Sequence, residues 1–235
     1  MRKLFDVAIL AGGLATRLHP LTESLPKSLI NIKGEPFISH QLRLLQKKGA
    51  QRIVICTGFL HTMLSDFIGN GKKMGLDISY SHDGEKRLGT AGALKKALPL
   101  LSDNFFVLYG DSYLPCDYAS VQANFMNSQK SALMTVFHNQ GQWDKSNVEF
   151  QDGEIFVYDK AQQTARMQYI DYGLGVFQKK AFDHIIAEQP YDLALLYQNM
   201  LAQKQLAAYE MSERFYEIGS FAGIAELEWH LKCFR

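Results

Sequence analysis

Residues 5–18 of the chain, FDVAILAGGLATRL, are a short apolar run that passes directly into two adjacent glycines and then into Arg17. The run is too short for a helix and is typical of a strand covered on both faces. Gly12 and Gly13 allow positive φ and a close approach of backbone N–H groups to an anion. Thr16 adds a hydroxyl donor, and Arg17 adds a planar fork suited to phosphate oxygens. Because ligands bind at the carboxyl ends of strands in open α/β sheets, this stretch predicts such a sheet with a phosphate-binding loop.

Two common phosphate loops are absent from the sequence. The P-loop pattern G-x-x-x-x-G-K-[ST] does not follow Gly12 and Gly13, and the dinucleotide pattern G-x-G-x-x-G occurs nowhere. Kinases, GTPases and ordinary dehydrogenases are therefore disfavoured. A glycine turn followed by a surface arginine is the alternative that this loop alone leaves open.

Short apolar runs alternate with amphipathic segments in the first half of the chain. Strands are expected at residues 5–10, 52–57, 77–81 and 105–109. Helices are expected at residues 36–48, 61–68 and 90–101. This alternation predicts a largely parallel wound sheet with helices on both faces.

The pattern changes after about residue 130. Strands are expected at residues 132–138, 148–151, 154–158 and 169–177, and the segments 207–211 and 215–218 are short apolar runs. Helices are expected at residues 182–187, 193–203 and 221–232. No linker separates the halves, so the sequence predicts a single α/β domain over residues 1–235. The fold class is three-layer α/β/α with a mixed, mostly parallel sheet.

The composition excludes several classes of protein. The 235 residues have a formal net charge of +1, with 47% hydrophobic and 21% charged residues, so a sizeable core is expected and no strong field for nucleic acid or a membrane surface. No window approaches the ~20 apolar residues that a bilayer crossing needs, and no signal-peptide core follows the N-terminus. The three cysteines suggest neither a disulfide framework nor a zinc site. We expect a cytoplasmic protein, a monomer or a small homo-oligomer.

A second motif, Pro26-Lys27-Ser28-Leu29, follows the glycine loop. Together with Leu10 to Leu18 it resembles the signature of the sugar-phosphate nucleotidyltransferases, L-x-G-G-x-G-T-R-L followed by P-K. Ala15 stands where that signature has its third glycine. The resemblance implies the Rossmann-like nucleotidyltransferase architecture. It also implies a reaction that joins a nucleoside triphosphate to a sugar 1-phosphate and releases pyrophosphate.

The resemblance extends along nearly the whole chain and assigns further residues. It implies that Asp111, after the strand 105–109, binds Mg²⁺, and that Glu217 is the second metal ligand in a segment where the family usually has aspartate. Carboxylates suit this hard cation. The residues that the resemblance assigns to the nucleotide are Leu10, Ala11, Gly12, Gly13, Thr16, Arg17, Lys27, Asp83, Gly89 and Thr90. For the side-chain contact to the base, Glu85 is the alternative to Asp83. Those that it assigns to the acceptor are Asn147, Asp159, Lys160, Asp171 and Gly173.

These residues would promote the reaction through electrostatic interactions. A sugar phosphate is already largely an anion at pH 7, so no general base is needed. Arg17, Lys27 and Mg²⁺ held by Asp111 and Glu217 would neutralise charge and fix the geometry for attack on the α-phosphorus. Residues 1–130 would form the nucleotide-binding half and residues 131–235 the acceptor-binding half.

The short single-domain members of the family are the most similar in length. They include the heptose 1-phosphate guanylyltransferases and the N-acetylmuramate 1-phosphate uridylyltransferases, enzymes for cell-envelope polysaccharide or glycan assembly. Two alternatives stay open, namely cytidylyl transfer to a non-sugar phosphate such as phosphocholine and a catalytically silent nucleotide-binding regulatory protein. The base and the acceptor sugar are not specified by the sequence.

Overall fold

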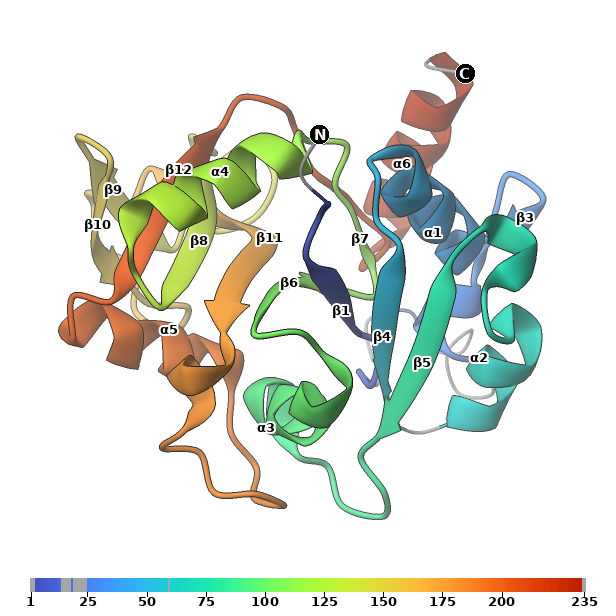
Figure 1. The fold of residues 1–235 in the computed structure, drawn as a ribbon. Helices are drawn as coiled ribbons and strands as arrows, with labels where there is room; N and C mark the ends of the chain where they lie inside the picture. Colours follow the sequence, from blue (N-terminus) through green and yellow to red (C-terminus); the bar gives the residue numbers. More distant parts are fainter. Residues whose placement is uncertain (1–2, 14–17, 19–24, 59, 234–235) are drawn as a thin grey trace.

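The computed structural model describes residues 3–13, 18, 25–58 and 60–233, and among them a mixed sheet of nine strands forms the centre (Figure 1). The parallel half of this sheet runs in the order β5–β4–β1–β6. Its strands are β1 (Asp6–Leu10), β4 (Arg52–Thr57), β5 (Asp77–His82) and β6 (Asn104–Tyr109). The predicted parallel sheet is therefore confirmed, with each strand within a residue of its expected position.

The second half of the chain extends the sheet beyond β6. Strand β11 (Tyr169–Gln178) lies antiparallel to β6, and β8 (Ala132–His138) lies antiparallel to β11. The hairpin of β9 (Val148–Gln151) and β10 (Glu154–Tyr158) joins β11 at its first residue. Strand β12 (Leu206–Met211) is an exception to the antiparallel pattern, because it pairs with β8 in parallel.

Helices cover both faces of the sheet, as predicted. Along β1 the side chains alternate, so that Val7 and Ile9 belong to one buried cluster while Ala8 and Leu10 belong to another. The first cluster includes side chains of α1 (Phe37–Lys47), α2 (His61–Ile68) and α4 (Tyr118–Ser128). The second includes those of α3 (Gly89–Ala97) and α5 (Leu193–Ala202). The result is the three-layer α/β/α arrangement.

Two helical segments differ from the sequence-based expectation. Helix α4 was not predicted, and the helix expected at residues 182–187 is absent. Instead, a 3-10 turn (Lys179–Phe182) is followed by irregular turns. Phe182 and Ile185 are buried but Ile186 is 64% exposed, so the segment has no second apolar turn to hold a helix against the core.

Short elements at the carboxyl edge of the sheet complete the fold. A 3-10 turn (Lys27–Leu29) leads into the hairpin of β2 (Asn31–Ile32) and β3 (Glu35–Pro36). Strand β7 (Ser112–Tyr113) follows β6 and pairs with β13 (Tyr216–Glu217), just before α6 (Phe221–Cys233). No helix in the part of the chain that the structure describes is long and apolar enough to cross a bilayer.

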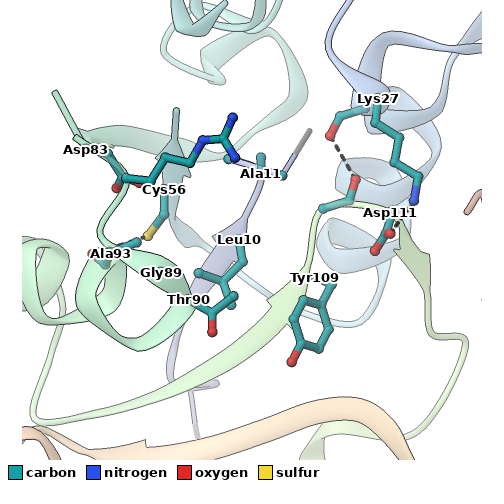
Figure 2. A pocket seen from close by; sticks show the side chains of 15 residues that line it. Leu10, Ala11, Lys27, Cys56, Asp83, Gly89, Thr90, Ala93, Tyr109 and Asp111 are labelled. Atoms are coloured by element: carbon teal, nitrogen blue, oxygen red, sulfur yellow. Dashed lines mark hydrogen bonds and ion pairs between the residues drawn. The ribbon is translucent and has the colours of Figure 1, made fainter. Parts of the chain in front are cut away.

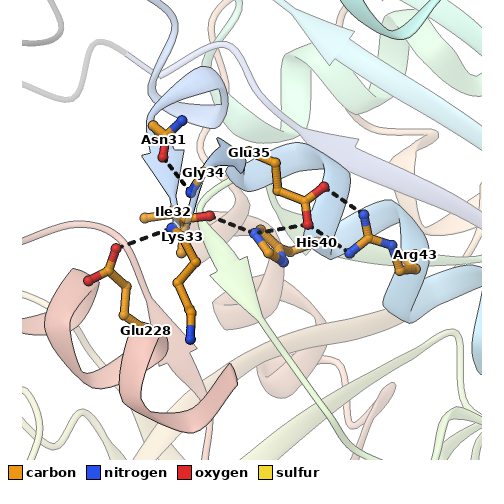
Figure 3. A network of polar contacts seen from close by, with 8 residues as sticks. All are labelled: Asn31, Ile32, Lys33, Gly34, Glu35, His40, Arg43 and Glu228. Atoms are coloured by element: carbon orange, nitrogen blue, oxygen red, sulfur yellow. Dashed lines mark hydrogen bonds and ion pairs between the residues drawn. The ribbon is translucent and has the colours of Figure 1, made fainter. Parts of the chain in front are cut away.

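The β2–β3 hairpin is tied to the helices on either side of it (Figure 3). Glu35 accepts two hydrogen bonds from the Arg43 guanidinium on α1, at 2.9 and 2.7 Å. His40 Nε2 lies 2.9 Å from Ile32 O, and Lys33 N–H donates to Glu228 on α6 at 3.2 Å. These contacts anchor the segment that follows Lys27.

Candidate active site

Glycines allow the carboxyl ends of β1, β4 and β6 to meet. Gly110 N–H donates to Leu10 O at 2.9 Å, and a Cβ at Gly110 would lie only 3.0 Å from Ala11. A Cβ at Gly12 would lie 3.3 Å from the backbone N of Gly58, the residue that follows β4. A side chain at either glycine would be crowded, because backbones approach one another here.

Gly12 and Gly13 adopt a different geometry from the one that the sequence suggests. Neither residue has a positive φ. Gly12 is packed against Gly58, whereas a Cβ at Gly13 would have open space around it. Close approach, and not a left-handed conformation, therefore explains the first glycine. Leu14 to Arg17, which include the predicted phosphate contacts Thr16 and Arg17 and the departure at Ala15, lie outside the described residues.

A first cavity of about 300 Å³ opens at this edge of the sheet (Figure 2). Its wall includes every described residue predicted to bind the nucleotide: Leu10, Ala11, Gly12, Gly13, Lys27, Asp83, Gly89 and Thr90. Asp111, a predicted metal ligand, also lines it. Lys27 and Asp111 form one end, and the apolar atoms of Leu10, Cys56 and Ala93 lie nearer the other (Figure 2).

Lys27 and Asp111 are in direct contact. The Lys27 ammonium donates to Asp111 Oδ2 at 2.6 Å, and the two side chains are 16% and 30% exposed. The next residue, Ser28, is buried and donates from its hydroxyl to Gly110 O at 2.8 Å. The 3-10 turn after Pro26 is thus pinned to the loop that carries the aspartate.

Glu217 lies near the C-terminus in the sequence, but its strand packs beside the loop that carries Asp111. In the β7–β13 pair Glu217 lies opposite Ser112, and Ile218 N–H donates to Asp111 O at 3.0 Å. Asp111 and Glu217 both line a second cavity. Two carboxylates fit a hard divalent cation that keeps water or phosphate oxygens as its other ligands. The part of the chain described contains no cluster of three or more His, Cys, Asp or Glu that could hold a metal ion.

The Asp111 loop is braced by Gln41 of α1, which sequence reasoning missed. Gln41 is 1% exposed, and its amide nitrogen donates to the carbonyl oxygens of Tyr109 (2.9 Å) and Ser112 (2.6 Å). These carbonyls flank Gly110 and Asp111. A buried glutamine on the apolar face of a predicted helix is the only signal that could have indicated this role.

The residues predicted to contact the base of the nucleotide also contact other residues of the chain. Gly89 has a φ of +68°, and a Cβ there would lie 2.7 Å from Tyr191 O. Thr90 Oγ1 accepts a hydrogen bond from Leu193 N–H at 2.7 Å, so it helps to start α5. Asp83 is half-buried, and burial raises the pKa of its carboxyl.

Glu85, the other carboxylate considered for the base, does not line the first cavity. It borders a neighbouring hollow together with His61 and His82. Arg87, which was not singled out in the sequence, does line the first cavity.

The second cavity, of about 560 Å³, adjoins the first, because Tyr109 and Asp111 line both. Of the predicted acceptor residues, Asn147, Lys160, Asp171 and Gly173 line it. Asp159 does not, because its carboxylate turns back to accept hydrogen bonds from the N–H groups of Ala161 (2.7 Å) and Gln162 (3.0 Å). These bonds lower the pKa of Asp159.

One wall of the second cavity is formed by contacts of Arg214 that the sequence motifs do not predict. The Arg214 guanidinium lies 3.3 Å from the centroid of the Trp143 ring and 4.8 Å from that of Tyr216. It also forms an ion pair with Glu226 of α6. Arg214 and Trp143 come from separate loops, so only the fold brings them together.

Comparison with known proteins decides the family. A family model described as nucleotidyl transferase matches residues 7–231. The chain belongs to this nucleotidyl transferase family. The resemblance stated from the sequence is thereby confirmed.

Two curated relatives of this family member are matched over nearly their full length. The N-acetylmuramate alpha-1-phosphate uridylyltransferase of Neisseria meningitidis is 26% identical over 227 residues, which cover 94% of this chain and 95% of that protein. The D-glycero-alpha-D-manno-heptose 1-phosphate guanylyltransferase of Campylobacter jejuni is 24% identical over 211 residues, covering 90% and 93%.

Other relatives are longer, and one solved structure illustrates the shared fold. The chain spans 52% to 60% of the length of several curated nucleotidyltransferases that it matches. The crystal structure of HddC from Yersinia pseudotuberculosis superimposes with a TM-score of 0.81 at 22% identity, covering 97% of this chain and all of that one. This likeness confirms the Rossmann-like α/β architecture.

Proposed function

We propose that this family member transfers a nucleotidyl group from a nucleoside triphosphate to a sugar 1-phosphate. A phosphate oxygen of the sugar 1-phosphate forms a bond to the α-phosphorus, and the bond from that phosphorus to the bridging oxygen of the β-phosphate breaks. The products are a nucleoside diphosphate sugar and pyrophosphate. The observation that carries the proposal is the meeting of two cavities at Tyr109 and Asp111.

The first cavity is proposed to take the nucleotide. Lys27 and the Gly12–Gly13 backbone supply positive charge and N–H groups for the β- and γ-phosphates, with Thr16 and Arg17 completing the loop. The base then extends towards Asp83, Gly89 and Thr90, where apolar side chains line the wall. This orientation puts the α-phosphate next to the second cavity.

Mg²⁺ is the proposed cofactor, held by Asp111 and Glu217. When bound, it would neutralise charge on the nucleotide's phosphates and fix their orientation. The second cavity is proposed to take the acceptor, with Lys160 near its phosphate. Residues 1–130 thus bind the nucleotide, and residues 131–235 supply most of the acceptor site.

The proposed substrates indicate where in the cell the reaction takes place and what its product is used for. We place the reaction in the cytoplasm, with a product used for cell-envelope polysaccharide or glycan assembly. The names of the two short relatives, which refer to N-acetylmuramate and heptose phosphates, support this.

The test is a matrix of four nucleoside triphosphates against a panel of sugar 1-phosphates, with phosphocholine included. Pyrophosphate release is measured with Mg²⁺ and with excess chelator. We expect release that needs both substrates and the metal, and that is lost in Asp111→Asn. Turnover only with phosphocholine would indicate the cytidylyltransferase alternative. Thermal stabilisation by a nucleotide with no turnover for any pair would indicate the silent regulatory protein.

A further inference from the structure

In the second cavity, Lys160 lies among several side chains that no sequence motif groups together. Lys160 Nζ lies 3.6 Å from Asp171 Oδ2. It also lies 5.5 Å from the ring centroid of Tyr109 and 5.9 Å from that of Tyr158. The Lys160 side chain is 46% exposed, whereas that of Asp171 is 5% exposed. The ammonium is therefore the accessible end of a largely buried group of side chains.

The Asp171 carboxylate is occupied by contacts within the chain. Its Oδ1 accepts a hydrogen bond from Gly173 N–H at 3.0 Å, and its Oδ2 accepts one from the Tyr158 hydroxyl at 3.2 Å. Its backbone N–H donates to Asn147 Oδ1 at 2.9 Å. With Lys160 beside Oδ2, little of this carboxylate is left to contact a sugar hydroxyl.

The backbone of β11 directs Asp171 to this position. The pairing of β11 with β8 shifts register between Asp171 and Gly175, and Gly173 within the shift has a φ of +94°. Such irregularities re-aim a side chain out of the regular alternation of a strand. The irregularity is therefore part of what places the carboxylate beneath Lys160.

We propose that Asp171 and Tyr158 are positioning residues, which hold the Lys160 ammonium beside Tyr109 at the junction of the two cavities, where it meets the phosphate of the acceptor. Asp171 then acts through Lys160 and is not a contact of the sugar ring. The inference rests on the proposed function, because it gives Lys160 the nucleophile's phosphate as its ligand.

The charges around Lys160 agree with this geometry. The titratable groups that face it are Asp171 on β11, Tyr109 on β6, Tyr158 on β10 and Asp192 at the start of α5. Burial opposes the charged form, but Asp171 and Tyr109 raise the pKa of Lys160 above its ordinary value.

Steady-state kinetics give the first test. In Asp171→Asn and Tyr158→Phe we expect the KM for the acceptor phosphate to rise about 10–100-fold, the range for a lost hydrogen bond to a charged group, while the KM for the triphosphate is unchanged. Asp171→Glu should recover part of the loss. Glu154→Gln, an exposed change on the same strand as Tyr158, is the control. A parallel rise of both KM values would overturn the inference in favour of a general structural role.

The second test needs no turnover. Lys160 is acetylated in the absence of substrates, and its rate is compared by mass spectrometry with that of Lys145, an exposed lysine of the same cavity. Because Asp171→Asn removes the charge that stabilises the ammonium, Lys160 should react several-fold faster relative to Lys145. An unchanged ratio overturns the inference whatever the activity of the wild type. A raised ratio in a protein without turnover supports the positioning and overturns only the proposed function.

Discussion

Lys27 and Asp111 form an ion pair with one another, although both are proposed to act on the nucleotide. The contact of 2.6 Å places the ammonium where a cation bound to Asp111 Oδ2 would lie. On the proposed function, a metal bound to Asp111 would have to open this ion pair, and the triphosphate would be the new partner of the released lysine. The pair would then link metal binding to nucleotide binding.

Metal binding without nucleotide tests this competition. In Lys27→Met we expect the affinity for Mn²⁺ to rise about three- to tenfold, because the competing charge is removed from a partly screened pair. Titration of free Mn²⁺ measured by electron paramagnetic resonance would show the change, and Asp111→Asn should abolish binding in either background. An affinity that is unchanged or weaker in Lys27→Met would contradict the competition.

Removing the Lys27 charge should lower turnover, although it should raise the affinity for Mn²⁺. Lys27→Ala removes a preorganised cation at the proposed pyrophosphate, and by the usual effect of one such group kcat should fall about 10²–10³-fold. The measurement is pyrophosphate release at saturating substrates, with circular dichroism to check that the variant is folded. Near-normal turnover in a folded variant would remove Lys27 from the proposed mechanism.

Several residues of the candidate site could be located from the sequence because their motifs are local. Lys27 follows the glycine loop, and Asp111 follows a strand that the sequence already marks. Asp159 shows the limit of such reasoning. The resemblance assigned it to the acceptor, whereas in the structure its carboxylate accepts hydrogen bonds from the backbone N–H groups of the turn that follows it.

Helix α1 supports the site through a single buried side chain. Gln41→Leu leaves the carbonyl oxygens of Tyr109 and Ser112 without their donor, and we expect a loss of about 1–3 kcal/mol in the free energy of unfolding. Since these carbonyls flank Asp111, Mn²⁺ affinity should fall as well. Urea denaturation and metal titration measure the two effects. Loss of stability with unaltered metal affinity would show that Gln41 does not position Asp111.

Helix α4 begins at an N-cap that the sequence analysis overlooked. Asp117 Oδ1 accepts hydrogen bonds from the N–H groups of Ala119 (3.0 Å) and Ser120 (3.3 Å), and Oδ2 accepts from the Ser120 hydroxyl (2.7 Å). Aspartate is among the preferred N-cap residues, so this signal was available. The helix expected at residues 182–187 is absent for a different reason, since Ile186 is exposed and the segment has no second apolar turn to pack against the core.

The Asp117 N-cap should make the stability of the fold depend on pH. Hydrogen bonding from Ser120 lowers the pKa of the Asp117 carboxyl. A lowered pKa in the folded state stabilises the fold above the unfolded pKa of about 3.9, and this contribution is lost as pH falls through the folded value. Asp117→Ala should therefore cost about 1 kcal/mol near pH 7, and less as pH falls from about 5 towards 3. Urea denaturation across this range measures it, with Asp66→Ala, an exposed aspartate on α2, as the control. A pH-independent difference would contradict the capping role.

At the scale of the whole molecule, the parallel half of the sheet was predictable, and so were the positions of strands β8 to β11 in the second half. How the strands of the second half pair with one another was not. Strands such as β1 and β4 are continuous apolar runs, so their burial and parallel pairing follow from the pattern. The parallel pairing of β12 with β8 and the register shift in β11 depend on contacts between distant segments. The same is true of the β7–β13 pair that brings Glu217 to Asp111.

We propose that one substrate lies in each cavity and that the two substrates react where the cavities meet. A crystal structure of the chain with a nucleoside diphosphate sugar and Mg²⁺ tests this most directly. We predict the nucleoside between Leu10 and Gly89, the diphosphate over Tyr109 and Asp111, and the sugar between Lys160 and Trp143. A product bound in the reverse orientation, or with its diphosphate away from Asp111, would contradict the account.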